Sequence, residues 1–306
     1  MYKIIISITI LFFLGCSTKI NPNEFTPLNA PKSKYLPSKN EIMYKPQVLI
    51  VPFNGAYAQI ATNTLREILI AYPAVKVIDR NFKSLKEEIK LAELAKTSES
   101  NLNQADYIIK GSVDSVYTKR IYHPPTYWKD KKGRIHSTKA YYEHIACANG
   151  HVIIIKIPEN YILSTKYFGK CVYETSYSSY YNYESLKIKA VRRAVKSIKE
   201  DLYKIFAKRG YIYEIRKKDD DIILHTTLGK EFGAKEGERV DIFTIKKTKI
   251  PFSNEYKTEI VKIGEGEIKI ADQSDSWILV TKKKENIKIG DFIKMNYKHS
   301  FWDIFK

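Results

Sequence analysis

The residues best suited to chemistry in this sequence are its cysteines and histidines. Three cysteines and six histidines occur in 306 residues, and His144, Cys147 and His151 stand close together in the chain. Imidazole and thiolate are preferred ligands of Zn²⁺, and histidine is also the commonest general base. On an extended strand, however, the side chain of residue 144 points away from those of residues 147 and 151. The three can converge on one ion only if the strand bends.

Two further histidines, His123 and His136, lie upstream of this group. No serine, cysteine or carboxylate stands at a recognisable motif spacing from any of these histidines. We therefore expect no catalytic residue, no metal site and no cofactor, and we expect that the protein is not an enzyme.

Cys147 and Cys171 are expected to form a disulfide. Residues 140–157 and 161–175 read as two antiparallel strands, and Pro158-Glu159-Asn160 between them suits a turn. If Ile157 pairs with Tyr161, the numbers of paired residues sum to 318, and Cys147 faces Cys171. Facing residues of antiparallel strands lie within reach of a disulfide, which an oxidising compartment favours. The alternative is two buried free thiols.

The third cysteine ends an apolar run at the N-terminus. Residues 4–14 are apolar at all but two positions, and the run ends in Phe13-Leu14-Gly15-Cys16. A membrane-spanning helix needs about 20 apolar residues, so this shorter run is typical of a secretory signal. Its ending resembles the bacterial lipobox. The resemblance implies that residues 1–15 are a lipoprotein signal peptide and that Cys16 carries acyl chains such as palmitate. The alternative is an ordinary cleaved signal.

The compartment follows from this N-terminus. Ser17 stands where an Asp commonly retains such lipoproteins at the inner membrane, so by analogy we expect an anchor in outer-membrane lipid, facing the periplasm. Export separates the protein from the chromosome, so we expect no nucleic-acid partner for its net charge of +18. Anionic lipid heads and cell-wall carboxylates remain as partners. The alternative is that the lysines form a solvated coat.

The rest of the sequence divides into a linker and two domains. Five prolines mark residues 16–46, which contain the acylated cysteine, as an extended linker. Residues 47–208 alternate between strands (48–53, 75–80, 105–113) and helices (around 60–72, around 85–95 and 185–208). This alternation predicts an α+β fold in which helices pack on a mixed β-sheet.

The order of motifs in this first domain resembles a known module. Val-Leu-Ile-Val-Pro-Phe, Val-Ile-Asp-Arg and Ala-Asp-Tyr-Ile-Ile-Lys-Gly-Ser, separated by helices, resemble the CsgG/TolB-N-like module of CsgG-type secretion lipoproteins, penicillin-binding-protein activators and the flagellar protein FlgT. In CsgG-type proteins two inserted segments cross the outer membrane. Here residues 116–142 contain adjacent prolines and a charged run, and residues 173–184 are too short to cross the membrane and return. Both features argue against a membrane-crossing pore.

The second domain has a different pattern. Residues 209–298 contain short strands separated by glycine and charged turns, which predicts a small all-β, SH3-like barrel. A repeated Lys-x-Gly-x-x-aliphatic step resembles the FlgT-like C-terminal barrel. Residues 299–306 are an aromatic tail with Phe301 and Trp302, which either packs on the barrel or binds a partner.

These features predict a protein that binds other proteins. The candidate contacts are Tyr177, Tyr180 and Tyr181 in the tyrosine-rich segment 173–184, together with Phe301 and Trp302. The segment could instead be a solvent loop. The resemblance implies a scaffold or assembly component of an envelope machine such as the flagellar motor outer rings, with periplasmic or outer-membrane protein partners and a homo-oligomeric ring as one arrangement. The alternatives are a CsgG-type oligomeric secretion channel subunit and an activator of a penicillin-binding protein.

Overall fold

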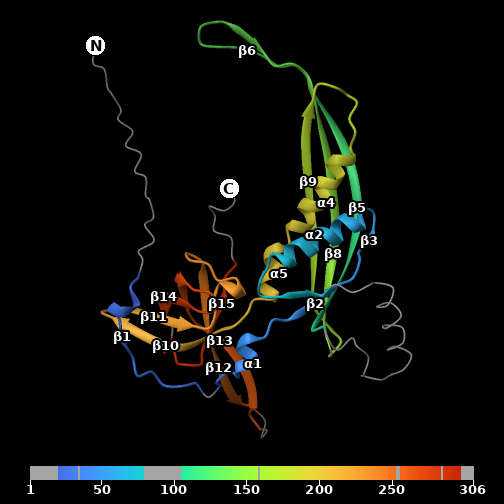
Figure 1. The fold of residues 1–306 in the computed structure, drawn as a ribbon. Helices are drawn as coiled ribbons and strands as arrows, with labels where there is room; N and C mark the ends of the chain where they lie inside the picture. Colours follow the sequence, from blue (N-terminus) through green and yellow to red (C-terminus); the bar gives the residue numbers. More distant parts are fainter. Residues whose placement is uncertain are drawn as a thin grey trace, which may run out of the picture.

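The protein is mostly β-structure (Figure 1). The computed structural model describes residues 20–33, 35–78, 105–157, 159–252, 256–283 and 285–297. Of these residues, 50% lie in strands and 18% in helices, and the strands form a long open sheet and a closed six-stranded barrel. The predicted fold class, an α+β module of packed helices followed by an SH3-like barrel, is therefore wrong. The helix expected around residues 85–95 lies outside the described residues.

The long sheet has the strand order β4-β2-β5-β8-β9, and β3 pairs with the middle of β5. Strand β2 is parallel to β4 and β5, whereas β5, β8 and β9 are antiparallel neighbours. The strands are β2 (Gln47–Ile50), β3 (Asn54–Gly55), β4 (Lys76–Ile78), β5 (Tyr107–His123), β8 (Tyr141–Lys156) and β9 (Tyr161–Ser176). With 17 residues, β5 spans about 55 Å.

The length of β5 is one reason why the fold class was wrong. The sequence predicts a strand that ends at Val113, but pairing with β8 continues from Ser115 opposite Asn149 to His123 opposite Tyr141. A register shift between Val113 and Ser115 separates the two halves of this ladder. The charged residues of the outer half are exposed to solvent and do not interrupt the backbone pairing.

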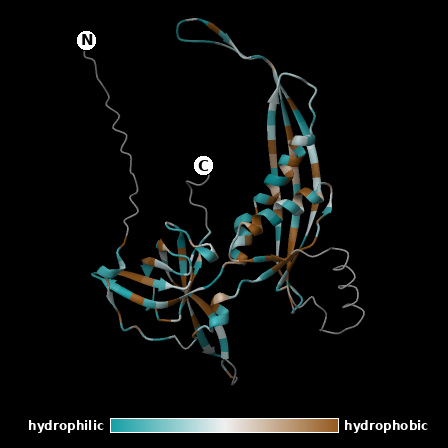
Figure 2. Cartoon of the chain, in the orientation of Figure 1, coloured by the Kyte–Doolittle hydropathy of each residue, from teal (hydrophilic) through white to brown (hydrophobic). Residues whose placement is uncertain are grey.

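Helices cover one face of the long sheet. They are α2 (Ala58–Ile70), α4 (Glu184–Lys196) and α5 (Lys199–Ile205). Alternate side chains of β8 point to this face, and Figure 2 shows hydrophobic and hydrophilic residues alternating along the long strands. The shared core contains Ala146, Ala148, Val152, Ile154, Leu65, Ala190 and Ala194, all fully buried. The small alanines allow α4 to lie close to the sheet.

The single helix expected over residues 185–208 is broken into α4 and α5. The hydroxyl of Ser197 donates a hydrogen bond to the carbonyl of Ala194 at 2.6 Å. Such bonds from a serine to the preceding turn compete with the helical ladder and bend the chain. Within the described residues, no helix has the length and the apolar run that a membrane span requires.

The C-terminal barrel closes because β15 pairs with both β12 and β10. Its order is β10-β11-β14-β13-β12-β15, with Ile212, Leu224, Val240, Ile268, Ile278 and Ile293 in the interior. The strands are β10 (Gly210–Lys218), β11 (Asp221–Thr226), β12 (Arg239–Lys249), β13 (Tyr256–Ala271), β14 (Ser276–Lys283) and β15 (Phe292–Met295). Strands of up to 16 residues are longer than the short strands expected for an SH3-like barrel.

The segment before β2 lies along the barrel and is not a free linker. We call residues 20–33 and 35–46 the N-terminal strap; it contains a 3₁₀ turn (Pro22–Glu24), β1 (Thr26–Pro27) and α1 (Lys39–Met43). Strand β1 pairs with β10, and Phe25 is buried against Ile223 and Trp277. Lys32 forms a bridge with Ile289 further along. The strap therefore differs from the expected extended linker because its apolar side chains pack on the barrel.

The barrel and the long sheet meet through three tyrosines and a lysine. The rings of Tyr72 and Tyr203 stack with centroids 4.1 Å apart, and the hydroxyls of Tyr72 and Tyr297 are 3.0 Å apart. Burial raises the pKa of Tyr297 to about 12. The ammonium of Lys208 donates to the carbonyls of Glu41 and Tyr44 at 2.5 and 2.7 Å. These contacts join the strap, the sheet and the barrel at the end of the sheet where β5 begins.

Candidate partner-binding surface

Exposed aromatic side chains gather at the end of the long sheet farthest from the barrel. We call residues 117–142 and 173–183 the distal tip; in Figure 1 its outer part, which carries β6, projects beyond the helices. Each large apolar side chain in the following set is at least half exposed: Tyr117, Tyr122, Tyr127, Trp128, Ile135, Tyr173, Tyr177 and Tyr180. Aromatic side chains of this kind form the energetic centres of protein interfaces. The distal tip is therefore the candidate functional site.

The outermost part of the distal tip is a small hairpin formed by β6 (Tyr127–Lys129) and β7 (Ile135–Ser137). The indole of Trp128 stacks on the ring of His136 with centroids 5.5 Å apart. The carboxylate of Asp130 accepts bonds from the Arg134 guanidinium at 2.7 Å and from the backbone N–H groups of the turn at 2.9 Å. The backbone bond to Arg134 is the main reason why the pKa of Asp130 is lowered. These contacts fix the turn of the hairpin and the position of the Trp128 ring against His136.

The tyrosine-rich loop after β9 divides into exposed and packed side chains. Tyr177 and Tyr180 are 76% and 85% exposed. Tyr181, by contrast, stacks on His144 with ring centroids 4.3 Å apart, and its hydroxyl bonds to Glu174. Burial raises the pKa of Tyr181 to about 12. Of the three tyrosines that the sequence suggested as partner contacts, Tyr177 and Tyr180 face solvent, whereas Tyr181 holds the loop against the sheet.

His144 is a buried structural histidine. It lies on the helix-covered face of β8, where its Nδ1 is 2.9 Å from the hydroxyl of Tyr183 and its Nε2 is 3.0 Å from that of Ser176. His151 lies on the opposite face and pairs with Asp114 at 3.0 Å. His144 and His151 thus bind different partners on different faces. Among the described residues, no group of His, Cys, Asp and Glu side chains is arranged to hold a metal ion.

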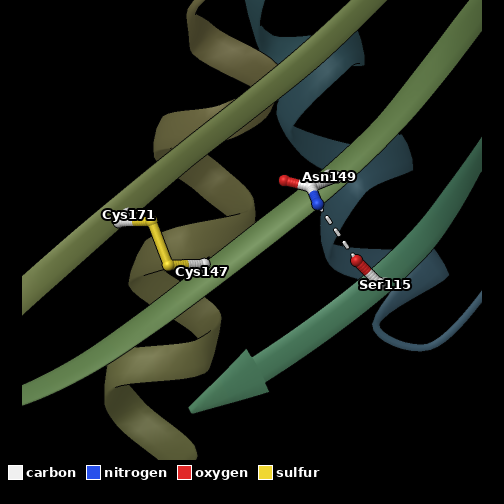
Figure 3. Close-up of a disulfide and its surroundings, with 4 residues drawn as sticks. All are labelled: Ser115, Cys147, Asn149 and Cys171. Atoms are coloured by element: carbon white, nitrogen blue, oxygen red, sulfur yellow. Dashed lines mark hydrogen bonds between the residues drawn. A yellow bond between two sulfur atoms is a disulfide. The ribbon is translucent and has the colours of Figure 1, made fainter. Parts of the chain in front are cut away.

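Cys147 and Cys171 form a disulfide on the face of the sheet that the helices leave open (Figure 3). The two residues are direct partners in the register of β8 and β9. Next to the turn, the numbers of paired residues sum to one less than the expected 318, as in the pair of Lys156 and Tyr161. A register shift beside Ile155 restores the expected sum before the cysteines. Tyr117 of β5 lies opposite Cys147. The disulfide therefore ties together the two strands that carry the inner part of the distal tip.

The distal tip is strongly basic. Its cationic side chains are Lys119, Arg120, Lys129, Lys131, Lys132, Arg134 and Lys139, whereas its carboxylates are Asp130 and Glu174, with Glu143 next to it in the chain. The carboxylates are engaged: Asp130 within the hairpin, Glu143 with His123 at 3.2 Å, and Glu174 with Lys189, which lowers the pKa of Glu174. The surface thus combines uncovered rings with excess positive charge, and its electrostatic complement is an acidic surface.

Three of the predicted site residues lie outside the described residues. These are the acylation site Cys16 and the tail residues Phe301 and Trp302. Sequence reasoning also missed the hairpin side chains Tyr127, Trp128 and Ile135, because their segment was considered only as a membrane-crossing hairpin, against which its prolines and charged run speak. The available signal was Tyr127-Trp128 and Ile135 on either side of a Lys-Asp-Lys-Lys-Gly turn, which is a hairpin pattern.

Comparisons with known proteins give only distant likenesses. The sequence matches no family model and no curated protein. Among solved structures, a minor lipoprotein of Acinetobacter baumannii is 9% identical, with 51% of this chain and 91% of that chain covered and a TM-score of 0.28. The lipoprotein GNA1162 of Neisseria meningitidis is 11% identical, with 50% and 97% covered and a TM-score of 0.25. Bacterial lipoproteins are thus among the similar structures, but at these TM-scores we base no functional conclusion on them.

Proposed function

We propose that this protein is a non-enzymatic, lipid-anchored scaffold of the bacterial envelope that holds an acidic partner protein at its distal tip. The observation that carries the proposal is the set of exposed tyrosines and Trp128 on a basic, internally braced projection. A monomeric soluble protein rarely leaves so many large rings uncovered without a partner.

The chemistry of the distal tip favours a protein over a bilayer as its partner. Segments that insert into a membrane interface combine lysine and arginine with Trp, Phe and Leu. Here the exposed rings are mostly tyrosines, which lie on the hairpin, on β5 and on the loop after β9. Tyrosine supplies large contact area at a small entropic cost and keeps a hydroxyl for hydrogen bonding, which suits a polar protein surface.

The other end of the molecule suits an anchor. Ile20 packs on the barrel beside Phe25 and Trp277, and Cys16 stands four residues before it. Four residues reach at most about 14 Å, so an acylated Cys16 would hold the barrel against the membrane surface. The distal tip lies at the far end of strands that are about 55 Å long. In the proposed arrangement, the outer membrane binds the barrel end and the periplasm contains the distal tip.

The experiment is site-specific photo-cross-linking in the native host. A photoreactive phenylalanine analogue replaces Tyr177 at the distal tip or, as the matched control, Tyr256 on the barrel, whose exposed fractions are 76% and 62%. We expect one protein adduct from position 177, identified by mass spectrometry, and none of the same mass from position 256. The yield of the adduct from position 177 should fall at least several-fold when the same chain also carries Trp128→Ser and Lys131→Glu.

Each other outcome contradicts the proposal. Adducts of equal yield and composition from both positions would show that the distal tip has no preferred partner. Cross-links to lipid alone from position 177 would make the distal tip a membrane contact. Adducts between copies of this chain from position 177 would replace the acidic partner by self-assembly into a ring.

A further inference from the structure

A cavity lies where the strap, the sheet and the barrel meet. Its volume is about 530 Å³, within the range of small-molecule sites. The wall includes residues from α1, from the beginning of β5, from the end of β8, from the chain between α5 and β10, and from β15. We call it the junction pocket. It is separate from the distal tip and plays no part in the function proposed above.

The lining of the junction pocket carries more cations than carboxylates. The cationic side chains are Lys156, Lys208, Arg209 and Lys294, and the carboxylates are Glu41 and Asp106. Both carboxylates are already engaged: Asp106 accepts from the Tyr44 hydroxyl and from the backbone N–H of Gln47 at 2.6 Å, and Glu41 accepts from the Tyr211 hydroxyl.

Two of the cations are likewise engaged. Lys156 pairs with Glu159 at 2.7 Å, and Lys208 bonds to two backbone carbonyls of the strap. Arg209 and Lys294 form no ion pair with a carboxylate of the described residues. The guanidinium of Arg209 lies over the ring of Phe292 at 4.8 Å and also interacts with the hydroxyl of Tyr211.

The surroundings of Arg209 and Lys294 disfavour their positive charges when no anion is bound. Lys294 is partly buried, and burial together with the charge of Arg209 lowers the pKa of its ammonium. Two like charges that line one pocket and are partly removed from water gain stability when an anion binds in that pocket. A guanidinium and an ammonium are also suitable donors for an oxyanion.

We propose that the junction pocket binds the oxyanion group, phosphate or carboxylate, of a small molecule through Arg209 and Lys294. The volume exceeds that of an oxyanion, and Tyr107, Phe206 and Tyr211 line the remainder. The ligand therefore carries a further organic part that packs on these rings. Because the lining belongs to the strap, the sheet and the barrel together, a bound ligand also stabilises their junction.

The test is calorimetric titration of the full-length acylated protein in a phosphate-free maltoside detergent. The probes are inorganic phosphate, acetate and dihexanoyl phosphatidylglycerol at constant ionic strength, with chloride as the reference anion. We expect at least one probe to bind, and Lys294→Met to weaken that binding about tenfold or more, because a charge-assisted bond is lost. Lys257→Met, which removes a lysine that is 67% exposed on the barrel, should leave it unchanged.

The three probes distinguish the sources of the anion. Binding of phosphate or acetate assigns a soluble ligand, whereas binding of the phospholipid alone assigns a lipid headgroup. If no probe binds more tightly than chloride, or if Lys294→Met and Lys257→Met behave alike, the proposal is wrong. If Lys294→Met fails to fold, a second measurement replaces it: the ³¹P NMR signal of phosphate is recorded with and without the unmodified protein. A phosphate signal that is not broadened by the protein would rule out a phosphate site.

Discussion

The aromatic side chains inside the barrel and under the strap differ in exposure from those of the distal tip. At the barrel end, Phe25, Trp277 and Phe292 are each 7% exposed or less, and cationic side chains lie over two of their rings. At the distal tip, Tyr177 and Tyr180 are 76% and 85% exposed. The hydrophobic effect favours covering rings wherever the chain allows it. The contact between strap and barrel is thus complete within one chain, and the uncovered rings of the distal tip are the basis for the proposal that a partner covers them.

The largest change in stability is expected when a buried ring at the barrel end is removed. Replacing Phe25→Ala removes a buried ring that joins the strap to Ile223 and Trp277. We expect the free energy of unfolding of the barrel to fall by about 3 to 4 kcal/mol. Denaturant unfolding followed by tryptophan fluorescence measures it. Tyr177→Ala, the matched control at the distal tip, should change the value by less than about 0.5 kcal/mol.

The second prediction concerns the sheet that links the two ends. The disulfide joins residues 24 apart in sequence, and replacing both cysteines by serine should destabilise the sheet by about 3 kcal/mol. Reductant should destabilise the parent by a similar amount and leave the double variant unchanged. Thiol counts that are equal before and after reduction of the unfolded protein would show that the two sulfurs are free.

A third prediction separates neighbours within the distal tip. Tyr181 is packed on His144, whereas Tyr180 projects into solvent. Tyr181→Ser should cost about 2 kcal/mol of stability, because a stacked ring is lost, and Tyr180→Ser should cost almost nothing. Thermal unfolding of the two variants measures the difference. Equal losses of stability in the two variants would contradict the packed position of Tyr181 and the exposed position of Tyr180.

The smallest effect expected is a pH effect on the strap. Glu24 accepts a bond from Lys218 at 2.6 Å, and this bond is the main reason why the pKa of Glu24 is lowered below 4.5. A lowered folded-state pKa contributes stability that is present above the unfolded value and is lost as the pH falls through the folded value. Carboxyl ¹³C shifts should show the lowered pKa in the parent and a return towards 4.5 in Lys218→Met. The same pKa in both proteins would contradict the contact.

The sequence was informative where the pattern is local. The Pro-Glu-Asn turn and the apolar strands on either side of it carried the information that Cys147 lies opposite Cys171. The fold class failed because strand length is set by pairing: β5 continues past Val113 only because β8 offers a complementary edge. The strap could not be predicted either, since its position depends on the packing of Phe25 against Ile223 and Trp277, which the barrel brings together. Exposure at the distal tip is likewise a tertiary property that no spacing of tyrosines reveals.

The central claim is that a partner protein covers the distal tip in the native envelope and does not cover Tyr256 on the barrel. Hydroxyl-radical footprinting tests it by comparing the oxidation of Tyr177 and Tyr180 with that of Tyr256, in intact envelopes and in the purified protein. All three side chains are at least 62% exposed in the single chain. The account predicts several-fold protection of Tyr177 and Tyr180 in envelopes and none of Tyr256. Equal oxidation of all three in both preparations would contradict it.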